Sequence, residues 1–309
     1  MHTRLEAPLP PAQSTPADTE LERDDLAVDV PAETLQRLGV CRVVASSRAR
    51  AAELHGLIAQ LQRARSDHTW RGFSPRDVER IAEELLAFEN ARRATRVFYY
   101  HGIVPGGGRA LIGTGAVSPE LRRGAPPGFA VVSRCYILER FRCARLYAPL
   151  LRHRVAQAEL ELGDRLRGIH FGSSNPRVLR AIQTGALALQ FLYVGRERVV
   201  CCGERFTVHD FLAPSERFRG DLLRPPLAGD AASAELHAAL RALCRDELGP
   251  GGYLRLRRLV DAADQAAAFP AEAQGAIASL LAFLAAIPVL EEPSPALPAG
   301  PQPDGVSDV

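Results

Sequence analysis

The segment with the clearest chemical potential is a strand-like run that leads through an arginine-containing turn into a helix. The strand pattern covers Phe129 to Leu138, and the helix pattern runs from Tyr147 to about Leu162. The first turn of a helix presents unpaired N–H groups and the positive end of the helix dipole, which together bind phosphate. Arg142 and Arg145 flank the turn and can add bidentate phosphate contacts. The pattern therefore indicates a phosphate or pyrophosphate site, and the alternative is a basic turn on a solvated surface.

The composition excludes several other chemistries. All 38 basic residues are arginines, set against 36 acidic residues. Without lysine there is no pyridoxal Schiff base, no lysine-containing phosphate loop and no kinase ion pair. The net charge of +2 gives no electrostatic signature for nucleic acid. The six cysteines show no paired spacing, so no metal site is predicted, and the His209-Asp210 pair has no nucleophile motif to serve.

The elements that position this turn follow from hydrophobic periodicity and turn residues. Helices are predicted at 48–65, from Ser74, at Pro176–Gln183 and at Ala273–Ile287. Further strands are predicted at Cys41–Ala45, Arg96–His101, Ala110–Val117, Gly168–Gly172, Phe191–Val194, Val199–Cys202 and Phe206–His209. This order predicts an α+β fold, an α/β sandwich in which helices flank a mixed sheet.

The domain organisation is predicted from composition. Residues 1–36 are expected to form a flexible arm, 37–215 the sheet domain, 216–290 a helical extension and 291–309 a disordered proline-rich tail. The helix at Ala273–Ile287 is apolar nearly all round. It is expected to pack on the sheet domain, and the alternatives are a wall for an apolar substrate or a membrane-docking face. No signal peptide and no membrane span are predicted, so the expected location is cytoplasmic.

The strand–turn–helix segment resembles the central motif of the Gcn5-related N-acetyltransferase (GNAT) superfamily. Ile137 stands at that motif's valine, Phe141 at its tyrosine, Arg142 at its Arg/Gln, and Leu150-Leu151 at its leucine pair. The resemblance implies a mostly antiparallel sheet and an N-acyltransferase acting on an amine of an amino acid, small molecule or peptide. The implied co-substrate is acyl-CoA or an acyl-phosphopantetheine on acyl carrier protein, with no tightly bound cofactor.

The resemblance also implies which residues hold the acyl donor: Ile137, Leu138, Arg142, Cys143, Ala144, Arg145, Leu146, Tyr147 and Asn175. Three positions depart from the family pattern. Arg145 and Tyr147 stand where glycine or alanine is usual, and Ile182 stands where many members have a tyrosine acid. A second resemblance, of Val132–Ile137 to the S/T-R-x-x-V strand, points to a branch that transfers fatty acyl groups and includes N-acyl amino acid synthases. Substrate contacts are then expected from Arg134, Tyr136 and Ser173.

In this fold the thioester lies where the strand ending near Leu138 parts from the strand starting near Gly168. A backbone N–H near Ile137 or Leu138 is the expected oxyanion donor. His170 and Glu139 are the candidate general bases. The alternatives are that His170 is a hydrogen-bonded sheet residue and that Glu139 only orders the turn. His153 has arginine neighbours on both sides and is expected to be solvated.

Two functions are therefore open. One is an N-acyltransferase. The other is a catalytically inactive member of the same fold that binds a partner, favoured by the residues at positions 145, 147 and 182.

Overall fold

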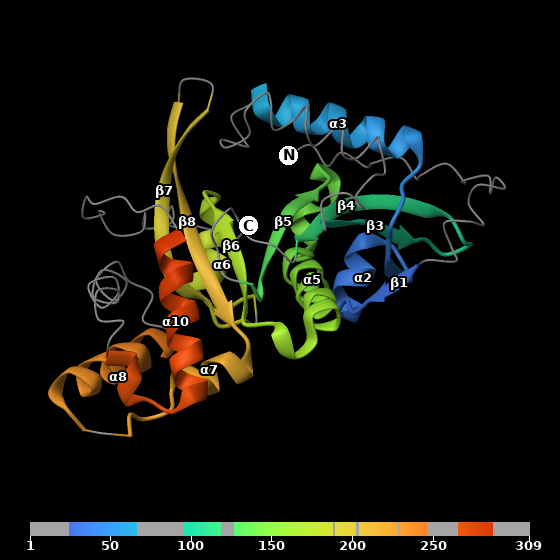
Figure 1. Cartoon of the computed structure of the whole chain (residues 1–309). Coiled ribbons are helices and arrows are strands. Elements are labelled where there is room, and N and C mark those ends of the chain that lie inside the picture. Colours follow the sequence, from blue (N-terminus) through green and yellow to red (C-terminus); the bar gives the residue numbers. More distant parts are fainter. Residues whose placement is uncertain are drawn as a thin grey trace, which may run out of the picture.

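The computed structural model describes residues 25–66, 95–118, 127–187, 189–201, 204–227, 229–245 and 265–286 (Figure 1). Their strands form one eight-stranded sheet in the order β1-β2-β3-β4-β5-β6-β8-β7. The strands are β1 (Leu26–Val28), β2 (Arg42–Ser46), β3 (Arg96–Ile103), β4 (Arg109–Ser118), β5 (Phe129–Ile137), β6 (Gly168–Ser173), β7 (Leu192–Cys201) and β8 (Glu204–Pro214). Only β5 and β6 run parallel, and every other neighbouring pair is antiparallel. The predicted α+β fold with a mixed, mostly antiparallel sheet is confirmed.

Helices pack on both faces of this sheet. They are α2 (Ala32–Leu38), α3 (Ala51–Ser66), α5 (Tyr147–Leu162), α6 (Pro176–Gln183), α7 (Glu216–Leu222), α8 (Ala231–Cys244) and α10 (Ala271–Ala286). Successive side chains of β3 point to opposite faces of the sheet, as in any β-strand. Tyr99 packs in the cluster of α3 residues, whereas Tyr100 points to the other face, where its hydroxyl donates to the Leu150 carbonyl of α5. Figure 1 accordingly shows α3 and α5 on opposite sides of β3 and β4.

Several predicted boundaries differ from the structure. Residues 25–36 were expected in the flexible arm, but they form β1 and most of α2, and β1 pairs with β2. The two strands predicted at Phe191–Val194 and Val199–Cys202 are one strand, β7, because the polar residues between them continue the ladder with β8. Helix α7 was not predicted. The helix predicted from Ser74, the remainder of the N-terminal arm and the C-terminal tail lie outside the described residues.

The C-terminal helices pack on the sheet domain. The ring of Phe283 on α10 lies 4.6 Å from that of Phe129 on β5 and 5.6 Å from that of His170 on β6. Phe218 on α7 contacts Phe129 as well, with the ring centroids 5.5 Å apart. Figure 1 shows α7, α8 and α10 together beside β8. The apolar side chains of α10 therefore pack in the core of the sheet domain. Within the described ranges, no helix is long and apolar enough to cross a bilayer.

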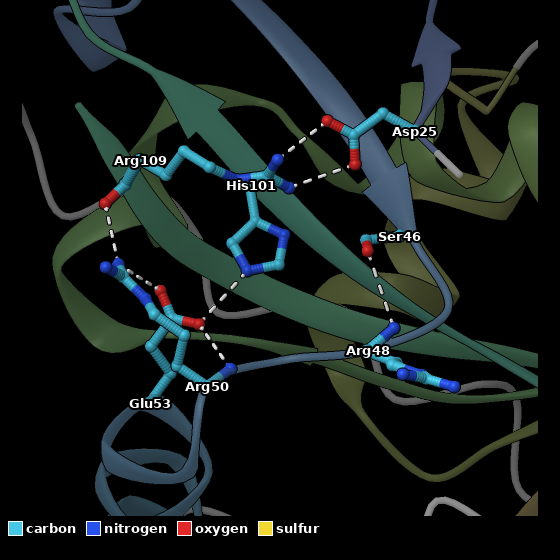
Figure 2. A network of polar contacts seen from close by, with 7 residues as sticks. All are labelled: Asp25, Ser46, Arg48, Arg50, Glu53, His101 and Arg109. Carbon is cyan, nitrogen blue, oxygen red and sulfur yellow. Dashed lines mark hydrogen bonds and ion pairs between the residues drawn. The ribbon is translucent and has the colours of Figure 1, made fainter. Parts of the chain in front are cut away.

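A buried polar network attaches the start of α3 to the sheet (Figure 2). The carboxylate of Glu53 accepts the Arg50 N–H at 3.0 Å and the Arg50 guanidinium at 2.8 Å, and it lies 3.2 Å from Nε2 of His101 on β3. Arg50 also donates to the Arg109 carbonyl, and the Arg109 guanidinium binds Asp25 through two contacts of 2.7 and 3.0 Å. The network links α3, β3, β4 and the chain leading into β1.

Acidification is expected to destabilise the wild-type protein more than Glu53→Gln. Burial disfavours the Glu53 carboxylate, but hydrogen bonds from His101 and Arg50 outweigh it and lower the pKa of Glu53 from 4.5 to about 2. Because the folded-state pKa is the lower one, this stabilisation is complete above about pH 4.5 and is lost as the pH falls towards about 2. A shift of this size corresponds to about 3 kcal/mol.

Urea denaturation of both proteins near pH 7 and near pH 3 measures this effect. The difference in unfolding free energy between wild type and Glu53→Gln should be largest near pH 7 and should narrow near pH 3. An equal pH dependence of the two proteins would contradict the prediction.

Candidate active site

The central strands β5 and β6 part after a short parallel ladder. The last parallel pair joins Val131 of β5 to His170 of β6. Beyond it, β5 continues to Ile137 and β6 to Ser173 without pairing to each other. An extended ligand can hydrogen-bond to strand edges that are not paired. The predicted parting of these two strands is thus present, and it begins at His170.

A β-bulge lies in the parted stretch of β5. Tyr136 pairs with Thr114 and Ser133 with Ala116, so Arg134 and Cys135 both lie opposite Gly115. A bulge of this kind bends the strand and leaves an extra residue outside the ladder. The side chain of Arg134, a predicted substrate contact, lies outside the described set.

The turn after β5 contains one more element than expected. The sequence predicted a strand that leads directly into the helix, but a 3₁₀ helix, η2 (Glu139–Ala144), lies between them. This 3₁₀ helix includes Cys143 and Ala144, which were predicted to bind the acyl donor. Arg145 follows in the left-handed region with φ 53° and ψ 32°. This conformation costs a non-glycine residue about 1 kcal/mol or more. Arg145 therefore adopts a conformation that a glycine at this position would adopt without the steric cost.

Several groups near the turn that were predicted to bind the acyl donor or to catalyse the transfer are already hydrogen-bonded within the protein. The Arg142 guanidinium donates from Nε to the Ile137 carbonyl at 3.1 Å, so it braces the end of β5. The Leu138 N–H donates to the Ile112 carbonyl at 2.9 Å and is therefore not offered as an oxyanion donor. The Glu139 N–H donates to Oε1 of Gln60 on α3 at 3.0 Å, while its side chain is exposed. Glu139 thus orders the turn through its backbone.

Few backbone N–H groups at the start of α5 are available to bind an anion. No side chain caps the helix, and Leu146 at the cap position is buried in the core. Pro149, in the first turn, has no N–H to offer. The first-turn N–H groups that remain for an anion are those of Tyr147 and Ala148. The exposed side chain of Arg145 lies directly before them in the chain.

Tyr147 extends from α5 to β6. Its ring lies 6.4 Å from that of Phe171, which belongs to the parted stretch of β6. Burial raises the pKa of Tyr147, with smaller effects from Cys135 and Arg154. A small residue here would leave the space between α5 and β6 open, whereas Tyr147 occupies it.

A fully buried arginine lies under the β5 bulge. Arg154 on α5 is 0% exposed. Its Nη1 donates to the Ser133 carbonyl at 3.0 Å and its Nε to the Leu150 carbonyl at 3.1 Å. Nη2 has no hydrogen-bond partner, and no carboxylate in the described ranges pairs with Arg154. Such a cation stabilises negative charge that comes close to it.

His153, the neighbour of Arg154, is also buried, so the prediction that it is solvated is wrong. Its Nδ1 lies 3.3 Å from the Tyr100 hydroxyl, and its ring packs on Phe98. Burial lowers the pKa of His153 to about 4, with a further contribution from Arg154. The buried face of α5 therefore includes two polar side chains, His153 and Arg154.

The remaining predicted site residues have local roles. Asn175 caps α6: its side chain accepts the Arg177 N–H at 3.0 Å, and its own N–H donates to Ser173 Oγ at 3.1 Å. Tyr136 is 2% exposed and packs in the cluster that includes α3 residues. Ile182 is buried in the core, so it supplies no acid.

His170 forms a buried pair with Asp210 of β8. The distance from Nε2 to Oδ1 is 3.0 Å, and the two residues are 4% and 1% exposed. This agrees with the interpretation of His170 as a hydrogen-bonded sheet histidine, and it leaves Nδ1 free for a catalytic role. Neither Asp210 nor Arg154 was among the predicted site residues. The i, i+4 spacing of Leu150, Arg154 and Ala158 marks Arg154 as a core position, whereas no sequence signal pairs residue 170 with residue 210.

Comparisons with known proteins give the following. No protein-family model matches the chain, and no curated protein matches its sequence. Among solved structures, the chain is similar to a spermidine N-acetyltransferase from Vibrio cholerae in complex with CoA and spermine, at 13% identity and a TM-score of 0.40, over 54% of this chain and 92% of that one. It is also similar to an acetyltransferase of the GNAT family from Streptococcus pneumoniae, at 14% identity and a TM-score of 0.38, over 56% and 100% of the two chains.

The described sheet has a single parallel pair at its centre, a helix between the two parallel strands, and an antiparallel hairpin at the far edge that pairs through its second strand. The resemblance to the GNAT motif implied a mixed, mostly antiparallel sheet of this kind; β1 lies at one edge of it, and α7, α8 and α10 follow β8 in the chain.

Proposed function

We propose that this protein is an acyltransferase that moves an acyl group from a thioester of phosphopantetheine to an amine. The observation that carries the proposal is the parting of β5 from β6 after the Val131–His170 pair, with the uncapped start of α5 in the adjoining turn. The first feature offers strand edges to an extended pantetheine. The second offers N–H groups and a positive dipole to a phosphate.

The proposed roles follow from this geometry. The N–H groups of Tyr147 and Ala148, together with the exposed Arg145, hold the phosphate of CoA or of a carrier protein. The thioester lies beside the β5 bulge, above the buried cation of Arg154. The acceptor amine attacks the carbonyl carbon, and His170 takes its proton. The motif at Val132–Ile137 supports a fatty acyl group as cargo and an amino acid as acceptor.

A second candidate function is partner binding without catalysis. The observation that favours it is the position of Tyr147, whose ring packs against Phe171 and occupies the space between α5 and β6. Pro149 also removes one donor from the first turn. A chain that keeps this space closed would bind a partner on the fold surface and release no thiol.

Titration with CoA, acetyl-CoA and palmitoyl-CoA, and with acyl carrier protein, tests the proposal, together with a thiol-release assay on a panel of amines. Binding of a donor and thiol release are expected. Failure of all these donors to bind would refute the enzyme, and thiol release would refute the non-catalytic module.

Charge reversal at Arg145 is expected to weaken donor binding selectively. Arg145→Glu keeps a non-glycine residue in the same backbone conformation but places a negative charge beside the phosphate. The donor Kd should rise by about tenfold or more, through loss of a charge-assisted contact and added repulsion. Arg217→Glu is the matched control, because Arg217 is an exposed arginine on α7 that pairs with the exposed Asp164. Equal effects of the two substitutions would place the phosphate elsewhere.

A further inference from the structure

The pair of His170 and Asp210 carries two buried polar atoms that have no hydrogen-bond partner among the described residues. One contact of 3.0 Å joins His170 Nε2 to Asp210 Oδ1. The other ring nitrogen, Nδ1, and the other carboxylate oxygen, Oδ2, have no hydrogen-bond partner. Buried polar side-chain atoms are usually paired, and leaving one unpaired costs about 1–3 kcal/mol. Two such atoms in one pair call for a functional explanation.

The ladder between β6 and β8 creates the pair. Asp210 lies directly opposite Gly172, and His170 lies two residues before Gly172 on the same face of β6. A Cβ at position 172 would lie only 3.2 Å from Asp210 Oδ1. Glycine therefore leaves the room in which the Asp210 carboxylate reaches along the strand to His170. The register holds both side chains without help from a flexible loop.

The pair lies where β5 and β6 part, which is where the proposed function places the thioester. His170 belongs to the last parallel pair before β5 and β6 part, opposite Val131. Phe283 of α10 packs edge-on against the imidazole, with the ring centroids 5.6 Å apart. A carboxylate–imidazole contact in an apolar setting is electrostatically stronger than one in water.

Other charged groups near the pair are few. From β8, His209 is buried next to Asp210 in the chain, and its own pKa is lowered by burial and by Arg196 of β7. Arg167, just before β6, donates to Ser279 of α10. Val131 of β5 and Phe283 of α10 bring no charge. Within the described residues, Asp210 is therefore the one carboxylate in contact with the His170 ring.

We propose that Asp210 is a positioning residue that holds the neutral His170 ring with its proton on Nε2 and its lone pair on Nδ1. His170 is then the general base of the acyl transfer, so this inference rests on the proposed function. As the amine nitrogen bonds to the thioester carbonyl carbon, Nδ1 takes one amine proton and Asp210 stabilises the imidazolium. The carbon–sulfur bond breaks, and the thiolate receives that proton to leave as a thiol. The products are one amide and one thiol.

The test combines a spectroscopic and a kinetic measurement. Nitrogen-15 NMR of the wild-type imidazole near neutral pH should show the Nε2–H tautomer for His170. An Nδ1–H tautomer would overturn the proposal, and this measurement needs no variant. In kinetics, Asp210→Asn should lower kcat by at least about tenfold with the donor KM nearly unchanged. It should also move the acidic limb of the pH profile to lower pH, because the imidazolium loses its counter-charge.

The controls separate this inference from the proposed function. His237→Gln alters a histidine that contacts the Leu223 carbonyl near α7 and should leave both kcat and the pH profile unchanged. An active wild type with an unaltered Asp210→Asn variant would refute the role of Asp210 alone. A wild type that releases no thiol with any donor and amine would refute the acyltransferase itself.

Discussion

Phe283→Ala is expected to destabilise the whole sheet domain by about 3–5 kcal/mol, the usual cost of removing a fully buried phenylalanine ring. Phe283 is 0% exposed and packs against Phe129 and His170, so its removal leaves a cavity between α10 and the two parallel strands. The measurement is urea denaturation followed by far-UV circular dichroism, with hydrogen exchange of the β5 amides as a second probe.

A substitution on the surface provides the control, and hydrogen exchange in β5 distinguishes the alternative outcome. Leu160→Ala on α5 removes a side chain that is 78% exposed and should change stability by no more than about 0.5 kcal/mol. If residues 216–290 formed an independent unit, Phe283→Ala would weaken the helices and leave exchange in β5 unchanged. Loss of protection in β5 would support the proposal that the C-terminal helices complete the core of the sheet domain.

Arg154→Met and Arg154→Ala are expected to differ by about 2–4 kcal/mol in unfolding free energy. Arg154 is a buried cation that donates to two carbonyl oxygens and also interacts with Tyr147, and no Asp or Glu in the described part of the chain pairs with it. Methionine fills the volume of the stem and removes the desolvated charge, so it should stay within about 1 kcal/mol of wild type. Alanine leaves a cavity beside Gly115 and should cost about 3 kcal/mol or more.

Urea denaturation of the two variants, with Arg152→Met as a neighbour on the same helix, measures the difference. Arg152 is partly exposed, and its substitution should have little effect. Equal destabilisation by methionine and alanine would mean that the charge itself stabilises the fold. That result would point to an anion bound against Arg154 in the folded protein.

The elements around the candidate site follow closely from local chemistry. The bounds of α6 were predicted because Asn175 caps its first turn and Pro176 suits the first helical position. The bounds of α5 follow from its leucine pair and the glycine that ends it. The glycines from 106 to 108 marked the hairpin between β3 and β4, which the structure confirms. Each of these signals acts between residues that are near neighbours in the chain.

The environment of individual side chains was less predictable. His153 was expected to be solvated because arginines stand on both sides of it, yet it is buried on α5. Arg142 was predicted to contact phosphate; its Nε bonds to the Ile137 carbonyl, and the phosphate contact stays a prediction. For His153 the helix was predicted correctly, and the burial of its side chain depends on Phe98 and Tyr100 of β3.

The sequence by itself determined the mixed α+β fold, the strand–turn–helix order from Phe129 to Leu162 and the absence of lysine chemistry. These properties depend on residue type and on spacings of a few positions. Only the tertiary structure decided that β5 and β6 part at His170, that Tyr147 fills the space beside Phe171, and that Asp210 meets His170. The last contact joins residues 40 positions apart on two strands, and its existence depends on sheet register, which no local pattern specifies.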